Sequence, residues 1–211
     1  MSRSETSDVQ RECACRTLFS LTVLALGVSA IRPHDYFTWF LEVGPVLIGL
    51  PILATTIRVF PLTPLLYQLL FLHALVLILG GHYTYAKVPL GEWAKEWFHF
   101  SRNHYDRLGH LFQGFVPALL VREILLRRSP LLSGKWLFFL VTCVCLAFSA
   151  VYELIEFATA LLSGGKADDF LGTQGDTWDT QRDMLMALIG ASSAQMLLHR
   201  HHGRQLKALR K

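Results

Sequence analysis

Six long apolar segments restrict the fold of this chain more than any other feature of its sequence. They cover residues 17–31, 36–57, 65–81, 108–126, 136–162 and 181–198. Only 17% of the 211 residues are charged, whereas a soluble domain carries about a quarter. A segment that crosses a bilayer must be helical, because the membrane interior holds no water to satisfy backbone groups. The sequence therefore predicts an all-α, polytopic membrane helical bundle of about six transmembrane helices, and it excludes a disordered or nucleic-acid-binding protein.

The six segments leave only short tails, so we expect a single transmembrane domain. The expected parts are a cytoplasmic N-terminal tail over residues 1–16, the transmembrane domain over 17–198 and a basic cytoplasmic tail over 199–211. Segment 108–126 ends near Arg122 and Glu123. The alternative is a bundle of five spans, in which this segment forms a re-entrant or interfacial helix.

The loop before segment 108–126 carries aromatic residues at helical spacing. Trp93, Trp97 and Phe100 recur at i, i+4 and i+7, while charged residues occupy the other faces. Aromatic side chains arranged in this way anchor helices at the boundary between membrane and water. The loop is therefore predicted to form a short interfacial helix over residues 91–100.

Lysine and arginine indicate the orientation, since cytoplasmic loops of membrane proteins carry an excess of both. With six spans and the N-terminus inside, 13 of the 20 Lys and Arg fall in inner segments. In contrast, 12 of the 16 Asp and Glu lie in the outer half, together with five of the nine histidines. We expect both termini in the cytoplasm and an outer half whose carboxylates and imidazoles suit a divalent cation or a proton relay.

Candidate metal ligands occur where the chain enters the fourth span. Asp106 and His110 are four residues apart and share one helix face, and His104 lies just before them. An Asp at this spacing can bind the same metal as the His or can orient its imidazole. His82, at the outer end of the third span, is a further candidate ligand. The structural alternative is interfacial capping and pairing with nearby arginines.

Two glutamates lie inside the outer half of the fifth segment. Glu153 and Glu156 are three residues apart and share a face. A charge near the bilayer centre costs on the order of 2.5–3.5 kcal/mol, so both must be paired, protonated, metal-bound or in contact with water. We predict catalytic roles for both, because neighbouring carboxylates suit a general acid, a general base or a proton carrier. Pairing with Arg107 or Arg182 is the structural alternative.

Three aspartates precede or open the sixth segment. Asp176, Asp179 and Asp183 follow a spacing of three and four residues and lie on one helix face. Helix capping accounts for the first two, which are also candidate metal ligands. Asp183 lies one turn deeper and is predicted to be catalytic. The small residues Ala187, Gly190, Ala191 and Ala194 follow it and permit close helix packing.

Four stretches, HYTYAKVPLG, RNHYDRLGH, YELIEF and DDFLGTQGDTWDTQRDM, together resemble the YjdF-type family of uncharacterised bacterial inner-membrane proteins. This resemblance covers nearly the whole chain and implies a bacterial inner-membrane protein, without an established activity. A weaker resemblance is to VanZ-like membrane proteins, some of which are linked to glycopeptide-antibiotic resistance. Its pattern corresponds here to Asp106 with His110, the pair of glutamates, and Asp183 followed by small residues.

Three functions are compatible with these residues. The first is a membrane-embedded enzyme that acts on a lipid or lipid-linked substrate at the outer leaflet, where a divalent metal would activate water or polarise the substrate. The second is a small proton- or ion-coupled transporter that uses the buried carboxylates as carriers. The third is a non-catalytic envelope assembly factor. The bilayer is the expected partner in each case, and a homo-oligomer is compatible with all three.

Overall fold

A computed structural model of the chain describes residues 3–163 and 173–209, with side chains described for residues 12–162 and 173–209. The secondary structure of these residues is entirely helical. The helices are α1 (Arg3–Ser29), α2 (Tyr36–Glu42), α3 (Gly44–Thr56), α4 (Pro64–Tyr83), the 3-10 turn η1 (Tyr85–Lys87), α5 (Pro89–Phe98), α6 (Tyr105–Arg128), α7 (Lys135–Ser163) and α9 (Asp179–Leu209). Each of the six apolar segments corresponds to one long helix or to the pair α2–α3, which confirms the predicted all-α membrane bundle.

Four helices of the described chain are long and apolar enough to cross a membrane: α1, α4, α6 and α7. The pair α2–α3 makes a fifth candidate span, bent by 45°. The sixth predicted segment, 181–198, is the apolar part of α9, which continues as a basic helix to Leu209. Helix α6 is continuous over 24 residues, so segment 108–126 is long enough to span.

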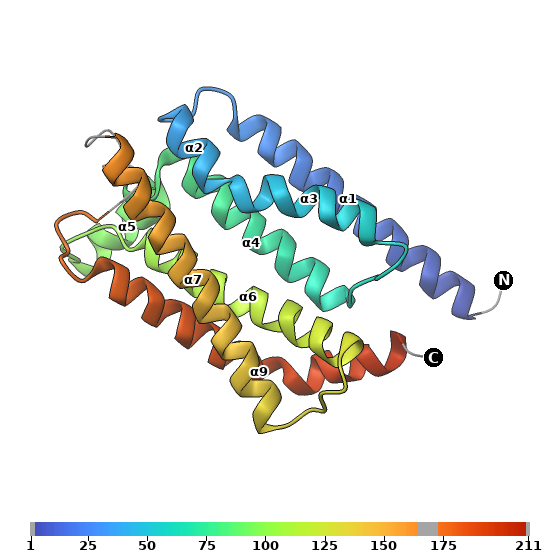
Figure 1. Cartoon of the computed structure of the whole chain (residues 1–211). Helices are drawn as coiled ribbons and strands as arrows, with labels where there is room; N and C mark the ends of the chain where they lie inside the picture. Colours follow the sequence, from blue (N-terminus) through green and yellow to red (C-terminus); the bar gives the residue numbers. More distant parts are fainter. Residues whose placement is uncertain (1–2, 164–172, 210–211) are drawn as a thin grey trace.

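The long helices lie lengthwise in one bundle (Figure 1). Helices α1 to α4 form one side and α6, α7 and α9 the other, with α6 in contact with α4, α7 and α9. The two ends of the described chain lie at the same end of the bundle, and α5 lies at the other (Figure 1). We call these the terminal end and the α5 end.

The break between α2 and α3 follows from the local sequence. Pro45 occupies the first turn of α3 and has no backbone N–H to continue the hydrogen bonds of α2. Helix α2 is preceded by the N-cap residue Asp35, whose carboxylate accepts a hydrogen bond of 2.7 Å from the backbone N–H of Thr38. The break places Glu42, which is only 3% exposed, at the bend of the span.

Helices α6 and α9 pack with their backbones in contact, and glycine makes this approach possible. A Cβ atom added to Gly114 would lie 2.7 Å from the carbonyl carbon of Ala187, and one added to Gly190 would lie 2.8 Å from the backbone nitrogen of Phe115. Ala187, like the other small residues of its face, is fully buried. The small-residue stripe of α9 therefore lies against α6.

A buried ionic network joins α4, α6 and α9 at the terminal end. The carboxylate of Glu123 accepts hydrogen bonds from Thr63, from Arg127 at 2.7 Å and from Nε2 of His202 at 2.9 Å. Arg122 donates to the other ring nitrogen of His202 at 2.9 Å. Glu123 and His202 are both fully buried. The two charged residues that interrupt the fourth apolar segment thus point into the bundle.

Helix α5 matches the expected interfacial helix. Trp93 and Trp97 are 58% and 80% exposed, while Gly91 lies directly against the side chain of Asn103. Asn103 is fully buried and donates through Nδ2 to the carbonyl of Val88 and to Glu92. Asn103 therefore holds α5 to the start of α6, and the two tryptophans of α5 remain exposed.

Candidate functional site

A cluster of buried carboxylates surrounds one histidine near the α5 end of the bundle. His110 of α6 lies with Nε2 at 3.5 Å from Asp106 of the same helix and at 3.7 Å from Glu153 of α7. Asp183 of α9 completes a group with Asp106 and His110, and Glu156 completes one with His110 and Glu153. In each group the ligand atoms lie within 4.8 Å of one another. Three helices thus bring together the five residues that we call the His110 cluster.

The hydrogen bonds of His110 determine which ring nitrogen faces the cluster. Nδ1 donates a hydrogen bond of 2.8 Å to the amide oxygen of Gln113. The proton of a neutral imidazole then lies on Nδ1, and Nε2 carries a lone pair. This lone pair faces the carboxylates of Asp106 and Glu153. Nε2 and the carboxylate oxygens are then all hydrogen-bond acceptors, with no donor between them. Such an arrangement is stable only with a cation or an additional proton among them.

Two oxygens of the cluster are buried and have no hydrogen-bond partner in the described part of the chain. They are Oε1 of Glu153 and Oδ1 of Asp183, on side chains that are 7% and 3% exposed. A buried polar atom without a partner costs about 1–3 kcal/mol. The two unsatisfied atoms come from different helices, α7 and α9, and both residues have a ligand atom within 4.8 Å of one of His110.

The spacing of these atoms is compatible with a metal. Ligand atoms about 2.0–2.1 Å from a tetrahedral metal lie about 3.3–3.4 Å apart, close to the 3.5 and 3.7 Å separations around Nε2 of His110. One imidazole with several carboxylates suits zinc, manganese or iron better than soft, thiolate-preferring ions. The cluster can therefore hold one divalent ion, with carboxylates to spare for proton transfer.

Asp176 and Asp179, which we predicted as candidate metal ligands, lie beside the His110 cluster and pair with arginines. Oδ2 of Asp176 accepts from Arg182, from Arg107 at 2.7 Å and from Arg102 at 3.5 Å. Arg102 also binds Asp179 directly. The pKa of Asp176 lies below its usual value, because the backbone N–H of Trp178 and then Arg182 and Arg107 stabilise the carboxylate. We call Arg102, Arg107, Arg182 and Asp176 the arginine group.

The arginine group and the His110 cluster are adjacent. Arg102 lies between them, with one nitrogen 3.9 Å from Oδ2 of Asp106. Its side chain is 6% exposed, whereas that of Arg182 is 50% exposed. The arrangement therefore passes from a buried set of carboxylates to a solvent-accessible set of guanidinium groups.

Histidines His82 and His104 lie outside the two groups of closely spaced ligand atoms. His82 donates through Nδ1 to the carbonyl of Ser29 at 2.9 Å, at the junction of α4 with the end of α1. Nδ1 of His104 accepts from Arg107 at 2.9 Å. The pKa of His104 is lowered by burial and by the charge of Arg107. These contacts give both residues structural partners, although both were predicted as candidate ligands.

Two further residues, Glu42 and Tyr152, adjoin the His110 cluster. The sequence alone assigned neither of them a role. The hydroxyl of Tyr152 donates to Glu42 at 3.0 Å, and its ring lies edge-on to that of His110 with the centroids 6.1 Å apart. Glu42 could have been found, because it is an acid inside an apolar segment. Gln113 and Tyr152 carry no such signal, since uncharged polar residues are common in membrane helices.

The loop before α9 is held to the loop before α6 by a pair of reciprocal hydrogen bonds. The backbone N–H of Asn103 donates to the side chain of Gln174 at 3.0 Å, and Gln174 donates back to the carbonyl of Asn103 at 2.9 Å. Gln174 adopts a left-handed conformation, with φ of 48°. The pairing places Arg102 and Asp176 face to face. Residues 164–172, which include the first part of the DDFLGTQGD stretch, lie outside the described residues.

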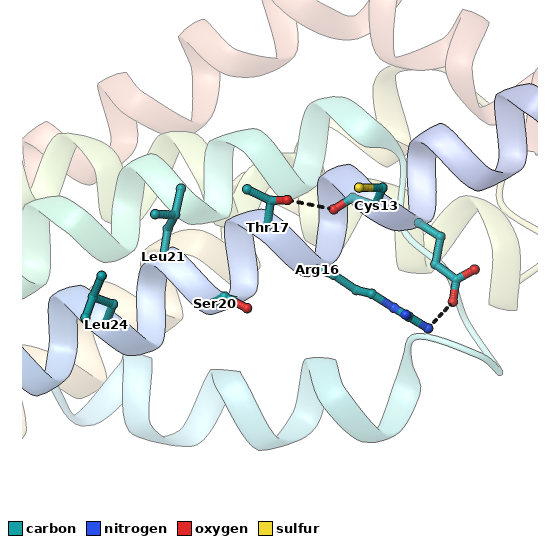
Figure 2. Close-up of a pocket in the computed structure, with 7 residues that line it drawn as sticks. Cys13, Arg16, Thr17, Ser20, Leu21 and Leu24 are labelled. Atoms are coloured by element: carbon teal, nitrogen blue, oxygen red, sulfur yellow. Dashed lines mark hydrogen bonds and ion pairs between the residues drawn. The ribbon is translucent and has the colours of Figure 1, made fainter.

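A separate groove of about 490 Å³ runs along α1. The residues that line it belong to that helix: Glu12, Cys13, Arg16, Thr17, Ser20, Leu21 and Leu24 (Figure 2). Thr17 donates to the carbonyl of Cys13, and Arg16 pairs with Glu12 at 2.7 Å. The polar groups of Thr17, Arg16 and Glu12 are thus bonded within the helix.

A bundle of apolar helices around a buried polar cluster defines an integral membrane protein. Residues 14–204 match the family described as "Predicted membrane protein (DUF2238)", and the chain belongs to this family. It is 56% identical over 188 residues to the inner membrane protein YjdF of Escherichia coli (strain K12), over 89% of this chain and 88% of that protein. The resemblance to YjdF-type proteins is confirmed, and the chain is an inner-membrane protein. No solved structure matches it.

Proposed function

We propose that the protein is a membrane-embedded, divalent-metal-dependent enzyme that acts on a lipid or lipid-linked substrate at the outer leaflet. One observation carries this proposal: the Nε2 lone pair of His110 faces carboxylate oxygens of Asp106 and Glu153 at 3.5 and 3.7 Å. A metal ion would satisfy all three atoms. Asp183, whose Oδ1 is buried and unpartnered among the described residues, offers a further ligand atom within 4.8 Å of those of Asp106 and His110.

The proposed chemistry follows from the composition of the cluster. Asp106 and His110, with Asp183 or Glu153, would hold the ion. When bound, a divalent metal lowers the pKa of a coordinated water or polarises a phosphoryl or carbonyl oxygen. A carboxylate left free of the metal, Glu156 or Asp183, would accept the proton of the attacking water as general base. Gln113 would keep the imidazole in the tautomer that binds metal.

The proposed orientation places the cluster at the outer leaflet. The two ends of the described chain lie at the same end of the bundle (Figure 1), and most Lys and Arg of the sequence flank that end. The rule that basic residues remain in the cytoplasm then favours both termini inside. The aromatic helix α5 would mark the outer interface, where a lipid headgroup can reach the His110 cluster.

Metal analysis of the purified protein tests the proposal. The full chain in detergent would be stripped with a chelator, reloaded with Mn²⁺ or Zn²⁺ and measured by mass spectrometry beside H110A and D183N. We expect about one ion per chain in the wild type, none in H110A and a reduced content in D183N. His199→Ala is the matched control, because His199 is exposed on α9 and bonds only to the carbonyl of Met196. A wild type that binds no more metal than H110A would overturn the proposal.

A lipid comparison tests the enzymatic part. Cells that lack the protein would be complemented with the wild type or with H110A, and their envelope lipids would be compared. We expect one lipid species to accumulate without the protein and to return to its normal level with the wild type only. Complementation by H110A would show that the cluster has no catalytic role.

A proton-coupled transporter is the second candidate, and it is favoured by the break between α2 and α3. Interrupted helices with buried acids are typical of transporters, and Glu42 lies at this break in contact with Tyr152. A proton shared by His110 and its carboxylates would then replace the metal. Proton flux into proteoliposomes that is abolished in E42Q, from protein that contains no metal, would favour this function over the enzyme.

A further inference from the structure

We infer that the arginine group binds a phosphate group, and that the substrate proposed above therefore carries a phosphate. The conclusion about the substrate deepens the proposed function and rests on it. The binding of phosphate by the arginine group does not depend on that function. The binding itself can be tested without any metal.

The charges of the arginine group are unevenly matched. Three guanidinium groups converge on a single oxygen, Oδ2 of Asp176. Asp179 serves Arg102 as a second partner, so Arg107 and Arg182 share one negative charge between them. A phosphate carries up to two negative charges and several acceptor oxygens, so it matches two arginines better than a single carboxylate does.

Arg107 has a donor to spare. One terminal nitrogen binds Asp176 and the other binds His104, while its Nε is buried without a hydrogen-bond partner in the described part of the chain. Nε and a terminal nitrogen of one guanidinium form the fork that binds two phosphate oxygens side by side. An anion in front of Arg107 would satisfy this atom.

The position of the group is also suitable. Arg182 is half exposed and Arg107 is 19% exposed, so an anion that displaces the Asp176 carboxylate can reach both from outside the protein. Arg102 lies behind them and extends to within 3.9 Å of Asp106 in the His110 cluster. A substrate whose phosphate lies on Arg107 and Arg182 would therefore have its neighbouring bonds next to the proposed metal. Phosphate and arginine next to a divalent metal are the usual elements of phosphoryl recognition.

The carboxylate of Asp176 binds the same arginines that we propose for the phosphate. Changing Asp176 therefore tests the inference directly. Its Oδ1 accepts from the backbone N–H of Trp178 at 3.1 Å, so the side chain stays in position while Oδ2 competes for the arginines. Removing this charge should strengthen phosphate binding, and removing an arginine should weaken it. Damage to the fold would not produce a gain.

The experiment measures binding of inorganic phosphate to chelator-treated protein by calorimetry at constant ionic strength. Relative to the wild type, we expect affinity to fall about tenfold or more in R107Q and R182Q, since each loses a charge-assisted contact. We expect a gain of similar size in D176N. Arg200→Gln is the matched control, because Arg200 is an exposed arginine that lies, like Arg182, on α9 but at the terminal end. The affinity of this variant for phosphate should be unchanged.

A second arm separates a lipid headgroup from free phosphate. The protein would be placed in nanodiscs of phosphatidylcholine with or without phosphatidic acid, and retained lipid would be counted by native mass spectrometry. Retention of phosphatidic acid that depends on Arg107 and Arg182, with weak binding of inorganic phosphate, identifies a lipid headgroup; the reverse identifies a soluble phosphate. Equal binding by wild type, R182Q and D176N in both arms overturns the inference. Because metal is absent, this result differs from failure of the metal-loading experiment.

Discussion

Replacing Gly114 with alanine should separate α6 from α9 and disturb the His110 cluster without changing any of its residues. The new Cβ would lie 2.7 and 2.8 Å from the carbonyl carbon and Cα of Ala187, whereas ordinary contact begins at 3.4 Å. Backbone atoms cannot rotate away, so the helices must move apart by at least about 0.7 Å. Overpacking of this kind costs about 1–3 kcal/mol.

The displacement would act directly on the proposed metal site. Gly114 is one helical turn from His110, and Ala187 is one turn from Asp183. A shift between the helices therefore changes the distance from His110 and Asp106 to Asp183 by a similar amount. Metal–ligand distances are held to within about 0.2 Å, so the G114A variant should lose most of its metal affinity.

Thermal unfolding in detergent and metal content after reloading measure the two effects. Gly49→Ala is the matched control, because a Cβ on this glycine of α3 meets nothing within 4 Å. We expect its stability to lie within about 0.5 kcal/mol of the wild type, with the metal content unchanged. If G114A matched G49A in both stability and metal content, the reasoning from backbone contact to site geometry would be refuted.

Three further predictions follow from the hydrogen bonds. Glu123→Gln should cost about 3–5 kcal/mol, because it removes the fully buried carboxylate that pairs with Arg127; chemical unfolding measures this, and a loss below about 1 kcal/mol would contradict it. Gln113→Leu should weaken metal binding about 10- to 100-fold through the orientation of His110; chelator competition measures the affinity, and an unchanged value would remove Gln113 from the site. The folded pKa of Asp176 lies below 3.8, so its stabilising contribution is complete above about pH 4 and is lost as the pH falls through the folded pKa. D176N should therefore flatten the acid side of a plot of melting temperature against pH, and an unaltered slope would show that this carboxylate is not stabilised by folding.

The helices could be predicted from the sequence because hydropathy and helical spacing are local properties. Each apolar segment corresponds to a helix, and the aromatic spacing of Trp93 and Trp97 indicated α5 correctly. The break at Val43 was missed, although Gly44 and Pro45 stand there, because a bend within an apolar run leaves the hydropathy unchanged.

The candidate site was predicted in part. The structure places Asp106, His110, Glu153, Glu156 and Asp183 together, since intramembrane acids on one helix face tend to point inward. Which acids pair with arginine could not be predicted, because Asp176 meets Arg107 and Arg102 only through the folding of two distant loops. The partner of Glu123 likewise lies 79 positions along the chain, at His202.

The contact between α6 and α9 has a mechanical consequence. These helices touch along their backbones at Gly114 and Gly190, and Glu123 with His202 fastens them at the terminal end. Sliding or tilting one helix against the other would break these contacts, so we expect α6 and α9 to move as one unit that carries one wall of the His110 cluster. If the proposed function is correct, we expect the motion that admits its substrate to come from α7 or from the bent pair α2–α3, where the hydrogen bond between Tyr152 and Glu42 would be the contact that opens. A lipid would then enter sideways, from the bilayer, between these two movable walls.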